Sequence, residues 1–317
     1  MKHRHGILNY TLDTVRQRNN RNYLILDGGM GEELFKRGVP DDRKTWSARA
    51  LLDQTHHHIV TETHEAFIEA GADIITTCNF AVTPNQGFSP EKISSLTALS
   101  GLLAQQAIQK QSTVNRKILI AGSLPPLVES YRADLVLPHD QGVEIYKLIV
   151  RSLDPFVDFF LAETMSSYDE AVQALEAVSL AGKEKTCAVS FSLTENGLLR
   201  SRELPYTAIT QLFQRFPNLL EACLFNCSSP EAITLSLTQL MNSSSNLPIL
   251  LGAYPNALTR IPDGWTMGTS TGPQPFRDDF PEKKFQEFAK LWLETMEIKI
   301  VGGCCGVGPS YIRTLCS

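Results

Sequence analysis

Short apolar runs alternate with longer amphipathic stretches along almost the whole chain. Several of the short runs are apolar at every position, as in Ile249-Leu250-Leu251, which is typical of strands that are buried on both faces. Strands of this kind occur in parallel sheets whose faces are covered by helices. The pattern predicts eight strands, at residues 23–27, 72–77, 117–121, 157–162, 186–191, 221–225, 247–251 and 299–301.

The longer stretches carry apolar residues at helical spacing, and capping residues mark some of their ends. Gly71 is expected to end one helix in a left-handed conformation, and Ser229 followed by Pro230 to begin another. Helices or short helical turns are predicted at residues 31–37, 46–52, 55–70, 91–111, 142–153, 168–181, 206–215, 230–241, 282–296 and 309–315.

Eight strand–helix units in succession predict a (β/α)₈ TIM barrel, an α/β fold with a single domain. An open doubly wound sheet is the alternative, and the number of strands favours the barrel. We expect the barrel to span residues 23–317, with residues 1–22 as a polar N-terminal extension. A loop rich in proline and glycine is predicted between residues 254 and 281.

Composition and charge exclude several classes of protein. The 317 residues carry a formal net charge of -5 and no long basic run, so nucleic-acid binding is not expected. No stretch approaches the ~20 apolar residues of a membrane span, and the polar N-terminus lacks the apolar core of a signal peptide. An odd number of cysteines, seven, without a secretion signal favours reduced thiols in the cytoplasm. The oligomeric state is left open.

The most distinctive stretch is Gly302-Gly303-Cys304-Cys305-Gly306, which follows the last predicted strand. Two thiols in a glycine frame are well placed to bind a soft metal, because glycine permits the sharp turn that aims both sulfurs at one ion. Catalytic zinc sites usually have three protein ligands and one open position. A third ligand is therefore expected elsewhere in the chain.

Cys227 is the best third ligand in the sequence. The active site of a TIM barrel lies at the carboxyl ends of its strands, and Cys227 follows the sixth strand as Cys304 and Cys305 follow the eighth. Three cysteines with an open fourth position are typical of catalytic zinc, whereas the alternative is that all three are packed thiols. The remaining cysteines are expected to be small buried apolar residues, and they are Cys78, Cys187, Cys223 and Cys316.

Five stretches together resemble the zinc-dependent homocysteine S-methyltransferases, from about residue 24 to the C-terminus. They are Asp27-Gly28-Gly29-Met30-Gly31, Glu163-Thr164, Asn226-Cys227, Tyr254-Pro255-Asn256 and Gly302-Gly303-Cys304-Cys305-Gly306. The resemblance implies a (β/α)₈ barrel whose catalytic residues Cys227, Cys304 and Cys305 hold Zn²⁺.

The same resemblance implies a site for the acceptor, homocysteine. Asp27 and Glu163 would bind its amino group, and the backbone of Gly28 and Gly29 would lie near its carboxylate. Asn226 would also belong to the substrate-binding site.

The chemistry of these residues agrees with the resemblance. A free thiol has a pKa of ~8.5, and coordination to Zn²⁺ displaces its proton. A metal-bound thiolate of homocysteine is then able to attack a methyl group on a cationic centre, giving methionine. S-methylmethionine is the favoured donor and S-adenosylmethionine the second. Trp46 is a candidate to hold a sulfonium donor by a cation–π contact, and the alternative is a packed aromatic residue.

Other interpretations of the sequence stay open. One alternative is that the acceptor is another small thiol or a selenol such as selenocysteine. Another is that the protein is a zinc-binding or redox-sensing barrel without catalysis. For Glu163, the alternative to binding an amino group is that its carboxylate caps a helix or forms an ion pair. The loop that begins Gly122-Ser123-Leu124-Pro125-Pro126 departs from the Gly-Pro pair of many relatives, and it lies on the rim where a donor would dock.

Overall fold

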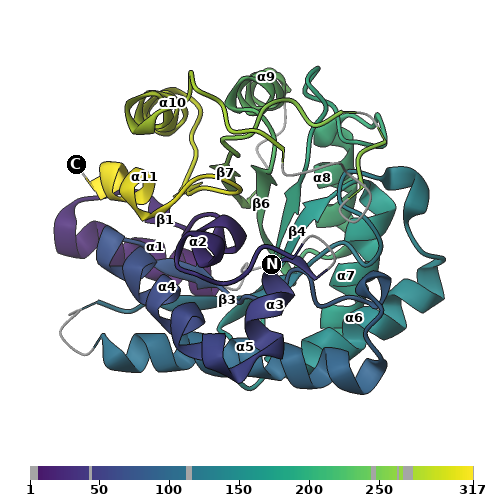
Figure 1. Ribbon diagram of the computed structural model, residues 1–317. Helices are drawn as coiled ribbons and strands as arrows, with labels where there is room; N and C mark the ends of the chain where they lie inside the picture. Colours follow the sequence, from purple (N-terminus) through teal and green to yellow (C-terminus); the bar gives the residue numbers. More distant parts are fainter. Residues whose placement is uncertain are drawn as a thin grey trace.

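Eight parallel strands form one sheet in the computed structural model (Figure 1). The structure describes residues 6–42, 45–111, 116–243, 248–262, 264–266 and 274–316. The strands are β1 (Leu24–Ile25), β2 (Ile74–Thr76), β3 (Leu119–Leu124), β4 (Phe159–Met165), β5 (Cys187–Phe191), β6 (Leu220–Asn226), β7 (Leu250–Tyr254) and β8 (Ile300–Val301). Their order in the sheet is β1-β8-β7-β6-β5-β4-β3-β2.

The two ends of this order meet between β1 and β2. Leu26 forms a parallel bridge to Ile74, and the amide of Asp27 donates to the carbonyl of Ile74 (3.0 Å). The amide of Asp73 donates to the carbonyl of Ile25 (2.7 Å) on the same seam. The sheet therefore closes on itself, and the predicted (β/α)₈ barrel is confirmed.

Helices alternate with the strands and cover the outer face of the barrel (Figure 1). Gly71 has a φ of +113° after α4, and Ser229 Oγ accepts a hydrogen bond from the amide of Ala232 (3.2 Å) at the start of α9, as the sequence predicts. The helices that follow strands or turns are α2 (Met30–Lys36), α3 (Arg49–Leu52), α4 (His57–Ala70), α5 (Pro90–Lys110), α6 (His139–Leu153), α7 (Tyr168–Ala181), α8 (Pro205–Arg215), α9 (Pro230–Met241), α10 (Glu282–Thr295) and α11 (Pro309–Arg313). Among the residues that the structure describes, no helix combines the length and apolar character needed to cross a membrane.

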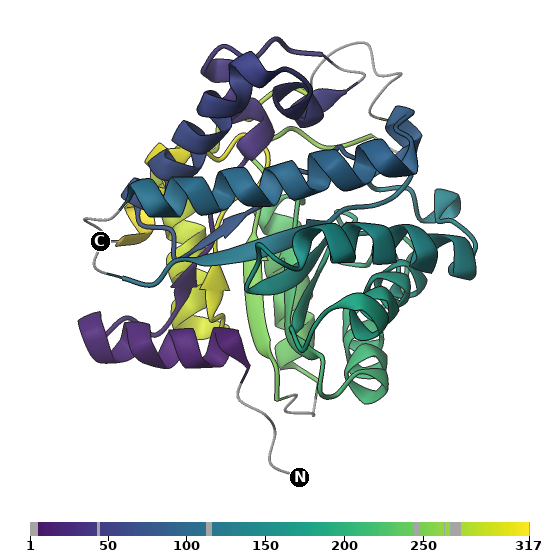
Figure 2. The same cartoon turned by 90° about the horizontal axis from the view of Figure 1, so that it is seen from below.

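A further helix, α1 (Ile7–Asn19), was not predicted from the sequence pattern. It lies across the end of the barrel away from α2 and α3 (Figure 2). Its residues Leu8, Leu12 and Val15 are buried in one apolar cluster with Leu24 and other residues of the strands. These few apolar positions stand among polar and charged neighbours, so the pattern is too sparse to predict a helix. The predicted N-terminal extension is thus helical over residues 7–19, and its division from a domain at residues 23–317 stays a prediction.

Three strands run three residues further at their carboxyl ends than the apolar pattern predicts. β3, β4 and β7 end at residues 124, 165 and 254, where ends at 121, 162 and 251 were expected. In β4 the pairing with β5 shifts register between Ala162 and Met165, and Thr164 has a φ of +62°. Irregular pairing at the rim of a barrel redirects side chains and is common beside active sites. Glu163 therefore lies inside β4, at this irregularity, rather than after the strand.

Candidate active site

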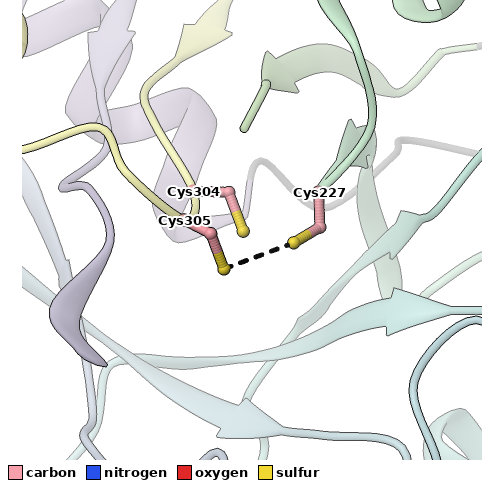
Figure 3. A group of neighbouring side chains, drawn as sticks. All are labelled: Cys227, Cys304 and Cys305. Carbon is pink, nitrogen blue, oxygen red and sulfur yellow. Dashed lines mark hydrogen bonds between the residues drawn. The ribbon is translucent and has the colours of Figure 1, made fainter. Parts of the chain in front are cut away.

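Three cysteines lie together at the carboxyl end of the barrel strands, with their sulfurs turned toward one another (Figure 3). Cys227 follows β6, whereas Cys304 and Cys305 follow β8. Their Sγ atoms all lie within 4.8 Å of one another, and the Sγ atoms of Cys227 and Cys305 are 3.7 Å apart. Tetrahedral zinc with bonds of about 2.3 Å to sulfur places two sulfurs roughly 3.8 Å apart. The arrangement therefore fits a metal ion.

The backbone around the cysteines holds their sulfurs in place. The amide of Cys304 donates to the carbonyl of Pro255 (2.8 Å), and its carbonyl accepts from the amide of Val307 (3.0 Å). Gly306 has a φ of +80°, which is the sharp turn that the glycine frame predicts. Cys227 has a φ of +48°, a conformation that costs a non-glycine residue about 1–3 kcal/mol and that clusters at functional sites. One of the three cysteine side chains is thus aimed by a strained backbone.

Gly28 and Gly29 allow the loop after β1 to lie against the cysteine loop. A Cβ atom at Gly28 would lie 2.1 Å from the carbonyl oxygen of Val307, and one at Gly29 would lie 2.6 Å from that of Cys304. The amide of Gly29 donates to the carbonyl of Val307 (2.9 Å). Glycine is therefore required here for packing, and a contact between this backbone and a substrate carboxylate stays a prediction.

The carboxyl group of Asp27 is buried at the end of β1. Its Oδ2 accepts from the amide of Thr76 (2.7 Å) and its Oδ1 from the Thr76 hydroxyl (3.0 Å). Burial raises the pKa of Asp27 to about 8, although the hydrogen bonds from Thr76 oppose the shift and the nearby carboxyl of Glu163 adds to it. Asp27 is therefore a buried acid whose ionised form has no opposite charge beside it among the residues that the structure describes.

Glu163 opens onto the same cavity from β4 and accepts a hydrogen bond from the Ser123 hydroxyl. Desolvation raises the pKa of Glu163 to about 7. The two simpler roles considered for this residue are not found: Ser167 caps α7, and within the described ranges no cationic side chain pairs with Glu163 or Asp27. The two carboxyl groups together form a place for a cation, and none of the described residues fills it.

Asn226 is buried at the end of β6, with its amide group directed to protein partners. Its Oδ1 accepts from the amide of Thr164 (3.0 Å) and the hydroxyl of Ser190 (2.8 Å). Its Nδ2 donates to the Thr164 hydroxyl (2.8 Å) and lies 3.9 Å from the Sγ of Cys304. These contacts favour a positioning role between β4 and the cysteines, and direct contact of Asn226 with a substrate stays a prediction.

A cavity of about 340 Å³ joins the cysteines to the two carboxyl groups. Trp46 lines it and packs edge-on against Phe35, with ring centroids 5.1 Å apart. Trp46 is thus both a packed aromatic residue and part of the cavity wall, and its contact with a donor stays a prediction. The aromatic side chains that line the cavity are Phe35, Trp46, Phe80, Tyr131, Tyr254, Trp265 and Phe276.

Two hydroxyl groups of the site were not predicted as functional. Tyr131 lies in the loop between β3 and α6, and its Oη is 3.0 Å from the Sγ of Cys227. No motif marks it, because it stands well beyond the end of its strand. Tyr254, at the end of β7, has a buried hydroxyl that makes no well-formed hydrogen bond to the described residues, although the side chain of Ser190 lies beside it. Leaving such a group unpaired costs about 1–3 kcal/mol, so Tyr254 is a further candidate for a substrate contact.

The model of the homocysteine S-methyltransferase family matches residues 24–317. The chain belongs to the homocysteine S-methyltransferase family. The family predicted from the five stretches is thereby confirmed, as is the prediction that the protein is a methyltransferase. The match begins at β1 and covers every strand of the barrel.

Two relatives and one solved structure are similar to nearly the whole chain. The identity to selenocysteine Se-methyltransferase from Brassica oleracea var. italica is 26%, over 92% of this chain and 88% of that protein. The identity to homocysteine S-methyltransferase YbgG from Bacillus subtilis is 23%, over 92% and 93%. The crystal structure of the homocysteine methyltransferase MmuM from Escherichia coli, in its metallated form, matches with a TM-score of 0.78 at 22% identity, over 96% of this chain and 98% of that one. This last likeness supports the fold.

Proposed function

We propose that this family member transfers a methyl group from a sulfonium donor to homocysteine, giving methionine, with Zn²⁺ held by Cys227, Cys304 and Cys305. The observation that carries the proposal is the meeting of three sulfurs and two desolvated carboxyl groups around one cavity. A small amino acid with a thiol matches both ends, because its ammonium suits the carboxyls and its sulfur suits a soft metal. The names of the relatives, which give homocysteine or selenocysteine as acceptor, support this class of substrate.

The side chains divide the work between binding and positioning. Asp27 and Glu163 accept charge-assisted hydrogen bonds from the ammonium group of homocysteine and so orient its thiol toward the cysteines. Zn²⁺ bound by three thiolates supplies the chemistry that keeps a further thiol ionised at neutral pH. The net negative charge of the cysteines and carboxylates attracts a cationic donor into the cavity. The methyl group then moves to the homocysteine sulfur, and the donor leaves as a neutral thioether.

The cavity favours a small sulfonium as the donor. Lined by the described residues, it measures about 340 Å³, near the lower end of the range of about 300–1,000 Å³ for ligand pockets, and it has to admit homocysteine as well. Its aromatic walls, Trp46 among them, attract cations. S-methylmethionine is therefore preferred to the larger S-adenosylmethionine.

The zinc-loaded protein is expected to form methionine from homocysteine faster with S-methylmethionine than with S-adenosylmethionine, and not at all with methyltetrahydrofolate. The folate donor is too large for a cavity of this size and lacks a sulfonium charge. The rate of methionine formation with each donor can be measured by chromatography across a panel that includes betaine. Turnover with betaine alone, or with no donor while zinc and homocysteine both bind, would contradict the proposal.

Trp46→Ala is expected to raise the Michaelis constant for the donor by about two- to thirtyfold, because a cation–π contact is worth about 0.5–2 kcal/mol. The constant for homocysteine should change less, since homocysteine is held by carboxyl groups. Steady-state kinetics with each substrate varied in turn separates the two. Trp46→Phe keeps an aromatic face and should recover part of the loss. Equal effects on both substrates would assign Trp46 a packing role alone.

Homocysteine affinity is expected to rise as the pH rises toward 8. The pKa values of Asp27 and Glu163 are raised to about 8 and about 7, so both carboxyls are largely protonated at pH 6 and bind an ammonium poorly. Each carboxyl contributes at most roughly tenfold in affinity per pH unit below its pKa. Binding of 2-aminobutyrate, which has the ammonium but no thiol, isolates this effect from ionisation of the acceptor thiol. Calorimetric titration with 2-aminobutyrate in two buffers should detect the protons that the carboxyl groups release on binding. An affinity that does not change with pH would show that the two carboxyl groups are not part of the binding site.

A selenol acceptor is the second candidate, favoured by the relative from Brassica oleracea. Selenocysteine can replace homocysteine in the same assay, and faster turnover with it would move the assignment to that acceptor. A barrel that binds zinc without catalysis would bind homocysteine and yield no methylated product with any donor. The cytoplasmic location stays a prediction.

A further inference from the structure

The metal-binding sulfurs differ in their surroundings. The Sγ of Cys227 lies 3.0 Å from the hydroxyl of Tyr131, whereas the Sγ of Cys304 lies 3.9 Å from the side-chain amide of Asn226. We propose that Tyr131 is a positioning residue that donates a hydrogen bond to the Cys227 sulfur and ties the metal centre to the loops around the cavity. This inference rests on the proposed function only in requiring that the three cysteines bind a metal ion.

The hydrogen bond has a fixed direction in the metal-loaded protein. A cysteine that coordinates a metal ion is a thiolate and has no proton to give. The Tyr131 hydroxyl is therefore the donor and the Cys227 sulfur the acceptor. Of these two contacts, the one to Cys227 is the shorter, so Tyr131 acts on the electron density of the Cys227 sulfur.

Both partners are held in strained backbone conformations. The φ angle is +68° at Tyr131 and +48° at Cys227, and each such conformation costs about 1–3 kcal/mol for a residue with a side chain. Strain of this kind persists only where the surrounding structure enforces it. Two strained residues that meet through their side chains indicate a contact that the fold is built to make.

Two side chains from other loops hold the ring of Tyr131. The guanidinium group of Arg200, between β5 and α8, lies 4.9 Å from the ring centroid. The ring of Trp265, between β7 and α10, packs edge-on with centroids 5.6 Å apart. A cation over the ring draws electron density from the phenol, which makes its hydroxyl a stronger donor. Three separate loops thus bear on one metal ligand.

The contact has a chemical consequence at the metal. Hydrogen bonds to coordinating groups tune the affinity and acidity of a metal site. Withdrawing electron density from the Cys227 thiolate leaves the ion more acidic, which favours ionisation of the thiol that fills the open position. Loss of the Tyr131 hydroxyl should therefore weaken homocysteine binding at pH 7 by about two- to tenfold and move its pH profile to higher pH.

Tyr131→Phe removes the hydroxyl and keeps the ring between Arg200 and Trp265. In the protein loaded with Co²⁺ alone, the sulfur-to-cobalt charge-transfer absorption should move to lower energy, because the Cys227 sulfur regains electron density. Tyr311→Phe is the matched control, since its hydroxyl donates to the carbonyl of Phe280 (3.0 Å) outside the cavity, and its spectrum should match the wild type. An unshifted spectrum in Tyr131→Phe with stoichiometric cobalt overturns the proposal.

A second substitution at the same position is expected to shift the charge-transfer absorption in the opposite direction. The proposal can therefore be tested even if Tyr131→Phe does not fold. Replacement of Tyr131 by 3-fluorotyrosine makes the hydroxyl more acidic and should move the absorption to higher energy. Arg200→Met, which removes the cation over the ring, should give a small shift to lower energy. These spectra require neither a methyl donor nor turnover. If the expected spectral shifts are absent, the proposed methyl transfer is unaffected. If the wild-type protein transfers no methyl group, the spectra still test the hydrogen bond from Tyr131.

Discussion

Cys305→Ala is expected to lose most of its metal and nearly all methyl transfer. A full set of zinc ligands is worth about 10–16 kcal/mol in small zinc domains, so one thiolate carries roughly 3–4 kcal/mol. The loss corresponds to about a hundred- to thousandfold in metal affinity. Metal content after dialysis against a chelator, together with methionine formation, measures both effects. Cys227→Ala and Cys304→Ala should behave alike, because the three sulfurs lie within 4.8 Å of one another.

Cys187→Ala is the matched control for these variants. Cys187 is fully buried in β5, and its thiol donates to the carbonyl of Ala188 (3.4 Å), away from the three site cysteines. Its replacement removes a core sulfur and a little stability, but the protein should keep about one metal ion per chain. If all three site variants held the metal as tightly as this control, the cysteine ligand set would be wrong.

Glu163→Gln should weaken homocysteine binding by about ten- to hundredfold while the metal stays in place. The variant loses a charge-assisted hydrogen bond to the ammonium, worth about 1.5–3 kcal/mol. Its side-chain oxygen still accepts from Ser123, so the shape of the site is kept. Asp27→Asn should have an effect of the same order. Titration of the metal-loaded variants with homocysteine gives the affinities.

Glu170→Gln separates charge in the site from charge elsewhere. Burial raises the pKa of Glu170 to about 7, as desolvation does for Glu163, but this carboxyl accepts from the amide of Ser166 (2.6 Å) at the start of α7, outside the cavity. The stability of the Glu170→Gln variant is expected to change, whereas its affinity for homocysteine should stay the same. Unchanged affinity in both Glu163→Gln and Asp27→Asn would remove the amino-acid pocket from the proposal.

Much of the fold follows from local chemistry that is visible in the sequence. Buried strands of a parallel sheet must be apolar throughout, and Gly71 and Ser229 mark helix ends by capping. The pattern fails where polar residues continue a strand, as at Ser123 in β3, because the backbone pairs regardless of the side chain. It also fails at α1, because the few apolar residues of this helix are buried only by contact with the end of the barrel, which the sequence pattern does not reveal.

The site was predictable where its chemistry requires particular residue types in a particular order. The cysteines and their glycine frame are of this kind. Tyr131 is not, since its place beside Cys227 depends on the paths of loops that are distant in sequence. The left-handed conformation of Cys227 and the contacts of Asn226 with Thr164 likewise arise only when the strands assemble.

The closure of the barrel has a consequence for its biosynthesis. β1 and β8 are neighbours in the sheet although they stand near opposite ends of the sequence, and Gly29 is bound to Val307 across that seam. During translation, the first carboxyl of the site is made long before the last two thiols, and no fixed site exists until β8 docks. Contacts so distant in sequence form late, because their loop-closure entropy must be overcome first. If Cys227, Cys304 and Cys305 hold a metal ion, as proposed, that ion binds only the assembled site and therefore favours the closed barrel by mass action.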